Sequence, residues 1–156
     1  MSLTANPYTT SISRSSATGT WPALSRAERD RLEGRIGDRV VAIEHFGSTS
    51  VPGLAATPII DICPVVPAMD AACACKPAML DLGYRFSAER EDWLAFERRD
   101  DADQQYSVRF HPLGSTRLER VLIFRDYLRD HPHARKHLRD RQALRGGRSP
   151  RGHRRV

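Results

Sequence analysis

The clearest structural signal in the chain is the run EHFGSTSVPGL at residues 44–54, followed closely by PIIDIC at residues 58–63. Two apolar segments flank the junction, VVAIEHF at 40–46 and IIDICPVV at 59–66, and each has the β-branched composition of a strand. The Gly, Ser, Thr and Pro residues between them are typical of a loop. We therefore expect two sequential strands joined by a loop that begins with a tight turn.

This turn begins with Gly47 and Ser48, residue types that let backbone N–H groups and a hydroxyl approach an anion. A short helical turn after them would add its positive end, so the pattern predicts a phosphate-binding turn. An ordinary strand-to-helix turn has the same composition and stays open as the alternative. The run lacks the Lys of a P-loop and the G-x-S-x-G spacing of a serine hydrolase, which excludes both classes.

Asp61 lies in the middle of the second apolar segment, where an uncompensated carboxylate is costly. Two interpretations stay open. The carboxylate either binds a metal ion or is a structural group paired with backbone amides or with an arginine such as Arg109 or Arg125. The two-residue period of a strand places Cys63 on the same face as Asp61.

Helices are expected on both sides of this pair of strands. Ser25 and Glu28 have the spacing of a capping box, which predicts a helix over 26–35 that ends at Gly37. A helix over 70–82 should end at Gly83, with Pro77 kinking or splitting it. Apolar residues at helical spacing predict a further helix that begins at Ser115 or Thr116, ends at His131 and Pro132, and is followed by another helix.

Three short strands, near 84–86, 93–97 and 105–110, are expected to extend the sheet in antiparallel fashion, with a charged turn over 98–103. Strands and helices in this order favour an α+β or α/β sheet domain.

The charge of the chain is unevenly distributed. The 156 residues include 25 Lys and Arg against 19 Asp and Glu, but nine basic residues and one acidic residue lie in 135–156, so the remainder is mildly acidic. We expect a disordered arm over 1–20, one domain over 21–145 and a disordered basic tail over 146–156. A solvated tail is the favoured interpretation over one that binds nucleic acid.

Composition also bears on location. No apolar run approaches the ~20 residues of a membrane-spanning helix, and the polar N-terminal residues do not have the pattern of a secretory signal. The three cysteines are too few and too clustered for a disulfide framework. These features predict a cytoplasmic protein without a membrane partner.

Three segments carry a resemblance to a known family. The runs GSTSVPGLAA at 47–56, PIIDI at 58–62 and LIFRDYLRDHP at 122–132 resemble the GrpB family, whose fold is similar to that of nucleotidyltransferases. The likeness covers about residues 21–140. It implies an α+β fold with a nucleotidyltransferase-like mixed sheet and helices packed mainly on one side.

The resemblance also implies an activity. Gly47 and Ser48, with Thr49 and Ser50 in the same turn, would hold the phosphates of a nucleoside triphosphate. Asp61 would be the catalytic carboxylate and would bind Mg²⁺, which neutralises charge while the nucleotidyl group moves to a hydroxyl acceptor of unknown identity.

The sequence departs from this pattern at several positions. Cys63 occupies the place of a second Asp, and a thiol is a poor Mg²⁺ ligand. Thr57 stands where the family usually has Lys, Arg109 replaces a His, and the segment 105–110 holds no third carboxylate. Glu44 could approach from the neighbouring strand. The alternative is therefore a catalytically degenerate module that binds a nucleotide or another anion on the same fold.

Overall fold

The structure, a computed structural model, describes residues 20–54 and 58–146, and the side chains of 142–146 are not described. Its sheet has five strands in the order β1-β2-β5-β4-β3. The strands are β1 (Ala42–Phe46), β2 (Ile59–Val66), β3 (Arg85–Arg90), β4 (Trp93–Arg99) and β5 (Gln105–Pro112). The helices are α1 (Thr20–Ile36), α2 (Met69–Ala74), α3 (Lys76–Asp81), α4 (Thr116–Asp130) and α5 (Pro132–Gly146), with 3-10 turns η2 (Gly37–Arg39) and η3 (Ser48–Ser50).

The sheet is mixed. Strand β2 pairs in parallel with β5, whereas the pairs β1·β2, β4·β5 and β3·β4 are antiparallel. A parallel pair needs a crossover connection, and α2, α3, β3 and β4 all lie between β2 and β5 in the sequence. The predicted α+β class and mixed sheet are confirmed.

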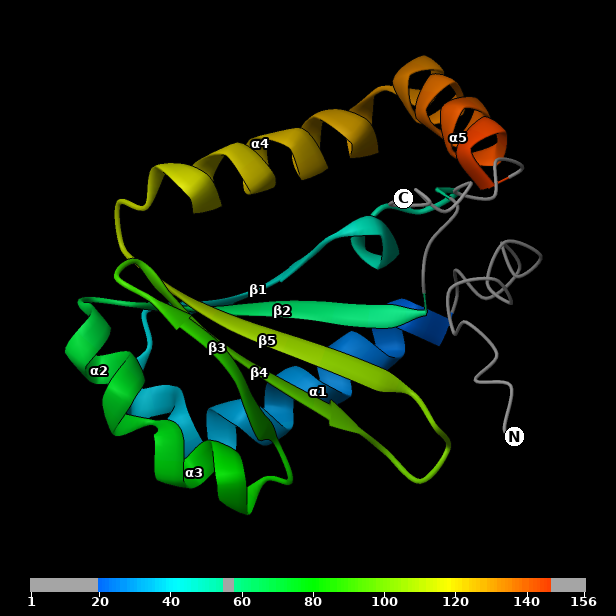
Figure 1. Cartoon of the computed structure of the whole chain (residues 1–156). Coiled ribbons are helices and arrows are strands. Elements are labelled where there is room, and N and C mark those ends of the chain that lie inside the picture. Colours follow the sequence, from blue (N-terminus) through cyan, green and yellow to red (C-terminus); the bar gives the residue numbers. More distant parts are fainter. Residues whose placement is uncertain (1–19, 55–57, 147–156) are drawn as a thin grey trace, which may run out of the picture.

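Helices lie on both faces of this sheet (Figure 1). The main core forms where α1, α2 and α3 cover one face, and its fully buried side chains include Leu32, Ile62, Met79, Phe96 and Phe110. Helix α4 crosses the other face, where Leu118 packs against Cys63 and Val65. The C-terminal half of α4 joins α5 in a small separate cluster around Leu128.

The predicted helix over 26–35 exists, but its predicted start is wrong. Helix α1 begins at Thr20, so Ser25 and Glu28 lie inside it rather than at its N-terminus. Glu28 is only 3% exposed. Its carboxylate accepts hydrogen bonds from Tyr84 Oη at 2.6 Å and from Arg98 Nε at 3.0 Å. The capping-box spacing therefore does not mark the start of the helix. Glu28 instead contacts Tyr84 and Arg98, which are distant in the sequence.

The other predicted elements exist, but the expected antiparallel extension of the sheet is wrong at one junction, because β5 joins β2 in parallel and only β3, β4 and β5 pair antiparallel among themselves. Pro77 splits the predicted helix over 70–82 into α2 and α3, and Gly83 follows α3 with a φ of 89°. Ser115 caps α4 by accepting the Leu118 N–H. The predicted arm and tail, apart from Thr20 and Gly146, and the substitution at Thr57 lie outside the described residues.

None of the helices in the described part of the chain has the length and hydropathy needed to cross a membrane.

Candidate functional site

The register of the sheet places three polar side chains in one row across its centre. Asp61 of β2 pairs with Ser107 of β5, and Ser107 pairs with Glu97 of β4. Directly paired residues point to the same face of a sheet, so the three share one face. It is the face opposite α1, because the alternate residues Ile60 and Ile62 belong to the main core.

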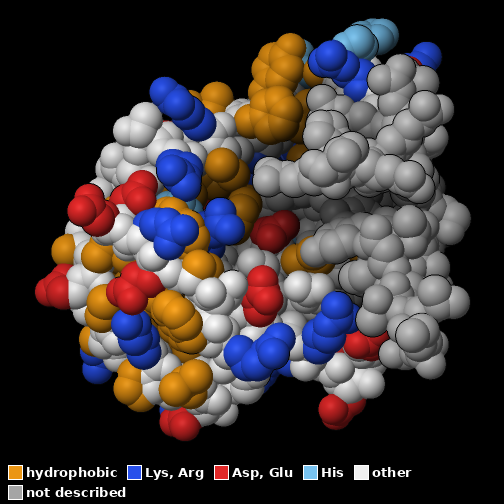
Figure 2. Space-filling model, viewed as in Figure 1, with side chains coloured by type: hydrophobic (Ala, Val, Ile, Leu, Met, Phe, Trp, Pro, Cys, Tyr) orange, Lys and Arg blue, Asp and Glu red, His pale blue; other side chains and the backbone are white. Residues whose placement is uncertain are grey.

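The neighbouring row contains two of the positions at which the sequence departs from the family pattern, Cys63 and Arg109. Cys63 of β2 pairs with Glu44 of β1, and Arg109 of β5 pairs with Ala95 of β4. Figure 2 shows acidic and basic side chains interspersed over this side of the molecule. The site face therefore carries both signs of charge within two adjacent rows.

Gly47 and Asp61 are in direct contact. Gly47 follows the last residue of β1 and has a φ of 74°, in the left-handed region that favours glycine. A Cβ at this position would lie 3.0 Å from the Asp61 Cγ and would overlap its Oδ2. The structure thus brings together the two features that the sequence singled out, the turn and the strand carboxylate.

The turn itself is stabilised by its own hydroxyl groups. Thr49 and Ser50 are both 4% exposed. The Thr49 hydroxyl donates to the Ile59 carbonyl at 3.1 Å and lies 2.9 Å from His45 Nε2, and the Ser50 hydroxyl donates to the Gly47 carbonyl at 2.5 Å. Ser48 is half-buried, and within 20–54 and 58–146 its hydroxyl has no hydrogen-bond partner. Of the predicted phosphate-binding residues, Gly47 and Ser48 are thus the two that remain available to a ligand.

Asp61 is poised to change protonation near neutral pH. Burial raises the pKa of its carboxyl group to about 6, and the nearby Arg109 guanidinium opposes that rise. Arg109 stacks over the Trp93 ring, 4.7 Å from its centroid, and its buried Nε has no hydrogen-bond partner among the residues described. A guanidinium with unused donors therefore lies near the carboxylate.

The donor set does not fit a Mg²⁺ clamp. Cys63 is fully buried, and burial raises the pKa of its thiol to about 12, so it stays protonated. Glu44 is occupied by Arg125, whose Nη1 lies 2.8 Å from its Oε2. In the part of the chain that the structure describes, no three His, Cys, Asp or Glu residues are grouped so as to hold a metal ion. Glu97, two strands away in the same row, is the other carboxylate of this row, and with Asp61 it does not make up the set of oxygen ligands that Mg²⁺ requires among the residues described.

Two arginines of α4 contact the β1 region, and only the first of them, Arg125, was singled out from the sequence. Besides Glu44, Arg125 pairs with Asp126 at 2.9 Å and donates to the His45 carbonyl at 2.9 Å. One helical turn later, Arg129 Nε donates to the Ser50 carbonyl at 2.9 Å. Spacing of i and i+4 on one helix face was the available signal.

Comparisons with known proteins agree with this architecture. A family model described as GrpB protein matches residues 12–143. The UPF0157 protein BH1888 of Halalkalibacterium halodurans is 33% identical over 123 residues, which are 79% of this chain and 63% of that protein. The UPF0157 protein YqkA of Bacillus subtilis is 34% identical over 119 residues, 74% of this chain and 34% of that protein. The chain thus spans well under the full length of these relatives.

Solved structures identify the fold. The conserved protein GrpB from Enterococcus faecalis superposes with a TM-score of 0.71 and 25% identity, covering 83% of this chain and 81% of that one. A cytoplasmic RNA terminal U-transferase gives a TM-score of 0.52 at 19% identity, over 75% of this chain and 36% of that one. The Cid1 poly(U) polymerase gives 0.54 at 15% identity, over 80% and 41%. The shared architecture is that of nucleotidyltransferases.

Proposed function

The chain belongs to the GrpB family, and from that premise we propose that it binds a nucleoside triphosphate at the turn formed by Gly47 and Ser48. The observation that carries the proposal is the contact between Gly47 and the Asp61 carboxylate on a nucleotidyltransferase fold. The half-buried residues Gly47 and Ser48 of the turn thus lie beside a titratable carboxyl group.

Charge has to be compensated for a phosphate to bind beside a carboxylate. The Asp61 carboxyl group, with a pKa of about 6, needs less free energy to become neutral than an ordinary aspartate at neutral pH. The Arg109 guanidinium supplies a positive charge on the same face, and among the residues described its buried Nε has no hydrogen-bond partner. These two residues make anion binding possible without a metal ion, so the degenerate nucleotide-binding module is the function the geometry supports best.

Nucleotidyl transfer from the triphosphate to an unidentified hydroxyl acceptor is the second candidate. The position of Asp61 on β2 favours it, together with the likeness to the structure of an RNA terminal U-transferase. The residues described do not complete a Mg²⁺ clamp, and we derive no catalytic step through that ion.

Calorimetric titration with each of the four common ribonucleoside triphosphates, with and without Mg²⁺, tests the proposal. Ser48→Ala should weaken binding about tenfold or more, because one hydrogen bond to a charged group is lost. Ser87→Ala, on the exposed edge strand β3, is the matched control and should leave affinity unchanged. Absence of binding by the wild-type chain, or equal affinity in both variants, would contradict the proposal.

Restoring the missing carboxylate separates the two candidates. Cys63→Asp should create Mg²⁺ affinity, and turnover of a labelled triphosphate, if the site is a transferase site that has lost one ligand. A Cys63→Ser variant controls for the loss of the thiol. An unchanged Mg²⁺ titration in Cys63→Asp would show that the metal site is not built at this position.

We also propose that the protein is located in the cytoplasm and that its domain has the boundaries expected from the sequence. Three free cysteines, two of them buried, are in keeping with a reducing compartment such as the cytoplasm. We retain the division into an arm over 1–20, a domain over 21–145 and a basic tail over 146–156 as a proposal, which limited proteolysis would test.

A further inference from the structure

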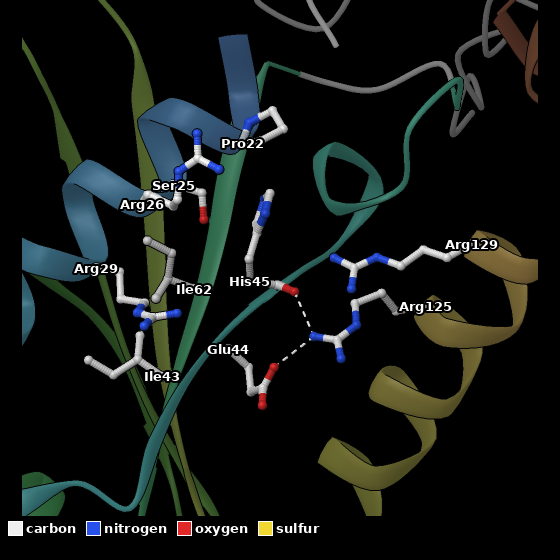
Figure 3. Close-up of a pocket in the computed structure, with 10 residues that line it drawn as sticks. All are labelled: Pro22, Ser25, Arg26, Arg29, Ile43, Glu44, His45, Ile62, Arg125 and Arg129. Carbon is white, nitrogen blue, oxygen red and sulfur yellow. Dashed lines mark hydrogen bonds and ion pairs between the residues drawn. The ribbon is translucent and has the colours of Figure 1, made fainter. Parts of the chain in front are cut away.

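A polar pocket that is separate from the candidate nucleotide site opens at the free edge of β1, between α1 and α4. Figure 3 shows its lining, with α1 contributing Arg26 and Arg29 and α4 contributing Arg125 and Arg129. Glu44 is the one carboxylate among the lining residues. Two arginines from α1 and two from α4 therefore line one space of about 240 Å³, and among them Arg125 is the one that binds the Glu44 carboxylate.

Most of these arginines keep donors free. Arg125 uses Nε on Asp126 and Nη1 on Glu44 and the His45 carbonyl. Arg129 uses Nε on the Ser50 carbonyl, and its terminal nitrogens come no closer than 3.9 Å to a carboxylate.

On α1, Arg29 lies 3.6 Å from Glu33 in an ion pair whose partners are both half-exposed, and such pairs are weak. Among the residues described, Arg26 has no hydrogen bond or ion pair. Arg26, Arg29 and the terminal nitrogens of Arg129 are thus available to a ligand.

The electrostatic potential of the pocket is positive. Burial lowers the pKa of His45 to about 4, with Arg129 and Arg125 adding to the effect, so its imidazole is neutral at physiological pH. The same surplus of positive charge that opposes protonation of His45 attracts an anion. The buried hydroxyl of Ser25 and the apolar side chains of Ile43 and Ile62 complete the walls.

We propose that this arginine pocket binds the terminal phosphate of a small phosphorylated compound. Guanidinium groups match a phosphate dianion through paired N–H donors, and a small pocket lined by several of them suits a single phosphate. A polynucleotide would need an open groove along which successive phosphates could lie. The apolar wall beside the arginines leaves room for a small organic group.

The proposal goes beyond the nucleotide-binding turn and does not depend on it. The residues that line the arginine pocket do not include Gly47, Ser48 or Asp61. Asp61 lies on the face of the sheet opposite α1, whereas the pocket lies at the β1 edge. Loss of phosphate affinity in variants of the α1 arginines, with Ser48 and Asp61 left intact, therefore reports on this proposal, whereas loss of triphosphate affinity in Ser48→Ala reports on the first.

The test is titration of the full chain with inorganic phosphate and with phenyl phosphate, followed by NMR of the His45 imidazole. Arg26→Gln combined with Arg29→Gln should weaken binding about tenfold or more, since two charge-assisted contacts are lost. Arg85→Gln combined with Arg120→Gln removes the same charge from exposed positions elsewhere and should change affinity less than about twofold. Thermal unfolding checks that both double variants fold.

Three results would overturn the proposal. The first is no phosphate binding by the wild-type chain at millimolar concentration, and the second is an equal loss of affinity in the two double variants. The third is tighter binding of a single-stranded oligonucleotide without terminal phosphate, with a steep salt dependence, which would assign the arginines to a polynucleotide. A His45 resonance that shifts with phosphate in the wild type and not in the α1 double variant supports the assignment.

Discussion

The Asp61 carboxylate lies where the Cβ of any larger residue at position 47 would be. Glycine is necessary at position 47 for two separate reasons. Its φ of 74° is positive, and the Asp61 carboxylate leaves no space for a Cβ. Ser48, the next residue, keeps its hydroxyl free because Thr49 and Ser50 make the internal bonds of the turn. Thr49 and Ser50 thus stabilise the turn, while Ser48 is the residue that could contact a ligand.

Gly47→Ala should destabilise the chain by about 3 kcal/mol, the sum of left-handed strain and overlap with Asp61. Gly114→Ala is the matched control, because its φ is 83° but a Cβ there would meet no described atom within 4 Å. It should cost only about 1 kcal/mol. Urea unfolding measures both values. Addition of Asp61→Ala to Gly47→Ala should recover about 1 kcal/mol through relief of the overlap, and strict additivity would contradict the proposed contact.

Asp61→Asn should change the pH dependence of stability. The folded-state pKa of about 6 exceeds the ordinary value of 3.8, so ionisation of Asp61 opposes folding. The wild type should therefore lose about 2 kcal/mol relative to Asp61→Asn as the pH rises from about 4 through 6, with no further divergence above 7. Urea unfolding at pH 4, 6 and 8 measures the difference. Parallel curves for the two proteins would contradict a raised pKa.

At the scale of the elements, Glu28 links α1 to the distant strands. Burial raises the pKa of this carboxyl group, but hydrogen bonds from Arg98 and Tyr84 outweigh burial and hold the pKa below its usual 4.5. Arg98 also stacks over Tyr106, 4.4 Å from the ring centroid. One buried carboxylate therefore joins α1 to the residue before β3 and to Arg98 of β4, which in turn contacts Tyr106 of β5.

Glu28→Gln should destabilise the chain by about 3 kcal/mol, because it leaves the buried guanidinium of Arg98 without its counter-charge. Glu33→Gln, on the same helix and half-exposed, should cost less than about 0.5 kcal/mol. Thermal unfolding compares the two. A loss at Glu28 no larger than that at Glu33 would show that this network does not stabilise the helix on the sheet.

The sequence predicted those elements whose signal is local. The apolar run at 59–66 matches β2 at both ends, and Pro77 interrupts the helix as expected. The start of α1 was wrong because Glu28 interacts with Arg98, seventy residues away, and no local pattern records such a contact. Arg129 was missed for the same reason, since its partner is a backbone carbonyl 79 residues earlier. In the candidate site, the turn and Asp61 were recognisable, but the register that aligns Asp61 with Ser107 and Glu97 was not.

At the scale of the whole molecule, the two faces of the sheet differ in their covering. Helices α1, α2 and α3 close one face, whereas α4 crosses the other mainly near β1, as Figure 1 shows. The candidate nucleotide site lies on the second face and the arginine pocket at its β1 edge. A single strand and its turn therefore separate two proposed anion sites.

Native thiol reactivity should report on the integrity of this layered core. Cys73 is exposed, whereas Cys63 and Cys75 are fully buried, and burial raises the pKa of each buried thiol. A disulfide reagent should modify Cys73 within minutes and the other two only as the chain unfolds. Cys73→Ser should abolish the fast reaction. Three thiols reacting at one rate in the native wild type would contradict the burial of β2.

Besides the ion pair between Arg125 and the Glu44 carboxylate, two bonds from α4 to the β1 region end on main-chain oxygens. Arg125 donates to the carbonyl of residue 45 and Arg129 to that of residue 50. Every amino acid offers the same carbonyl, so this anchoring tolerates evolutionary drift in the side chains at both acceptor positions. The arginines themselves have no such freedom, because lysine would offer one charged nitrogen where a forked group now spans several acceptors. These two bonds thus permit other side chains at positions 45 and 50, whereas Glu44 and the two arginines are constrained by their side-chain contacts.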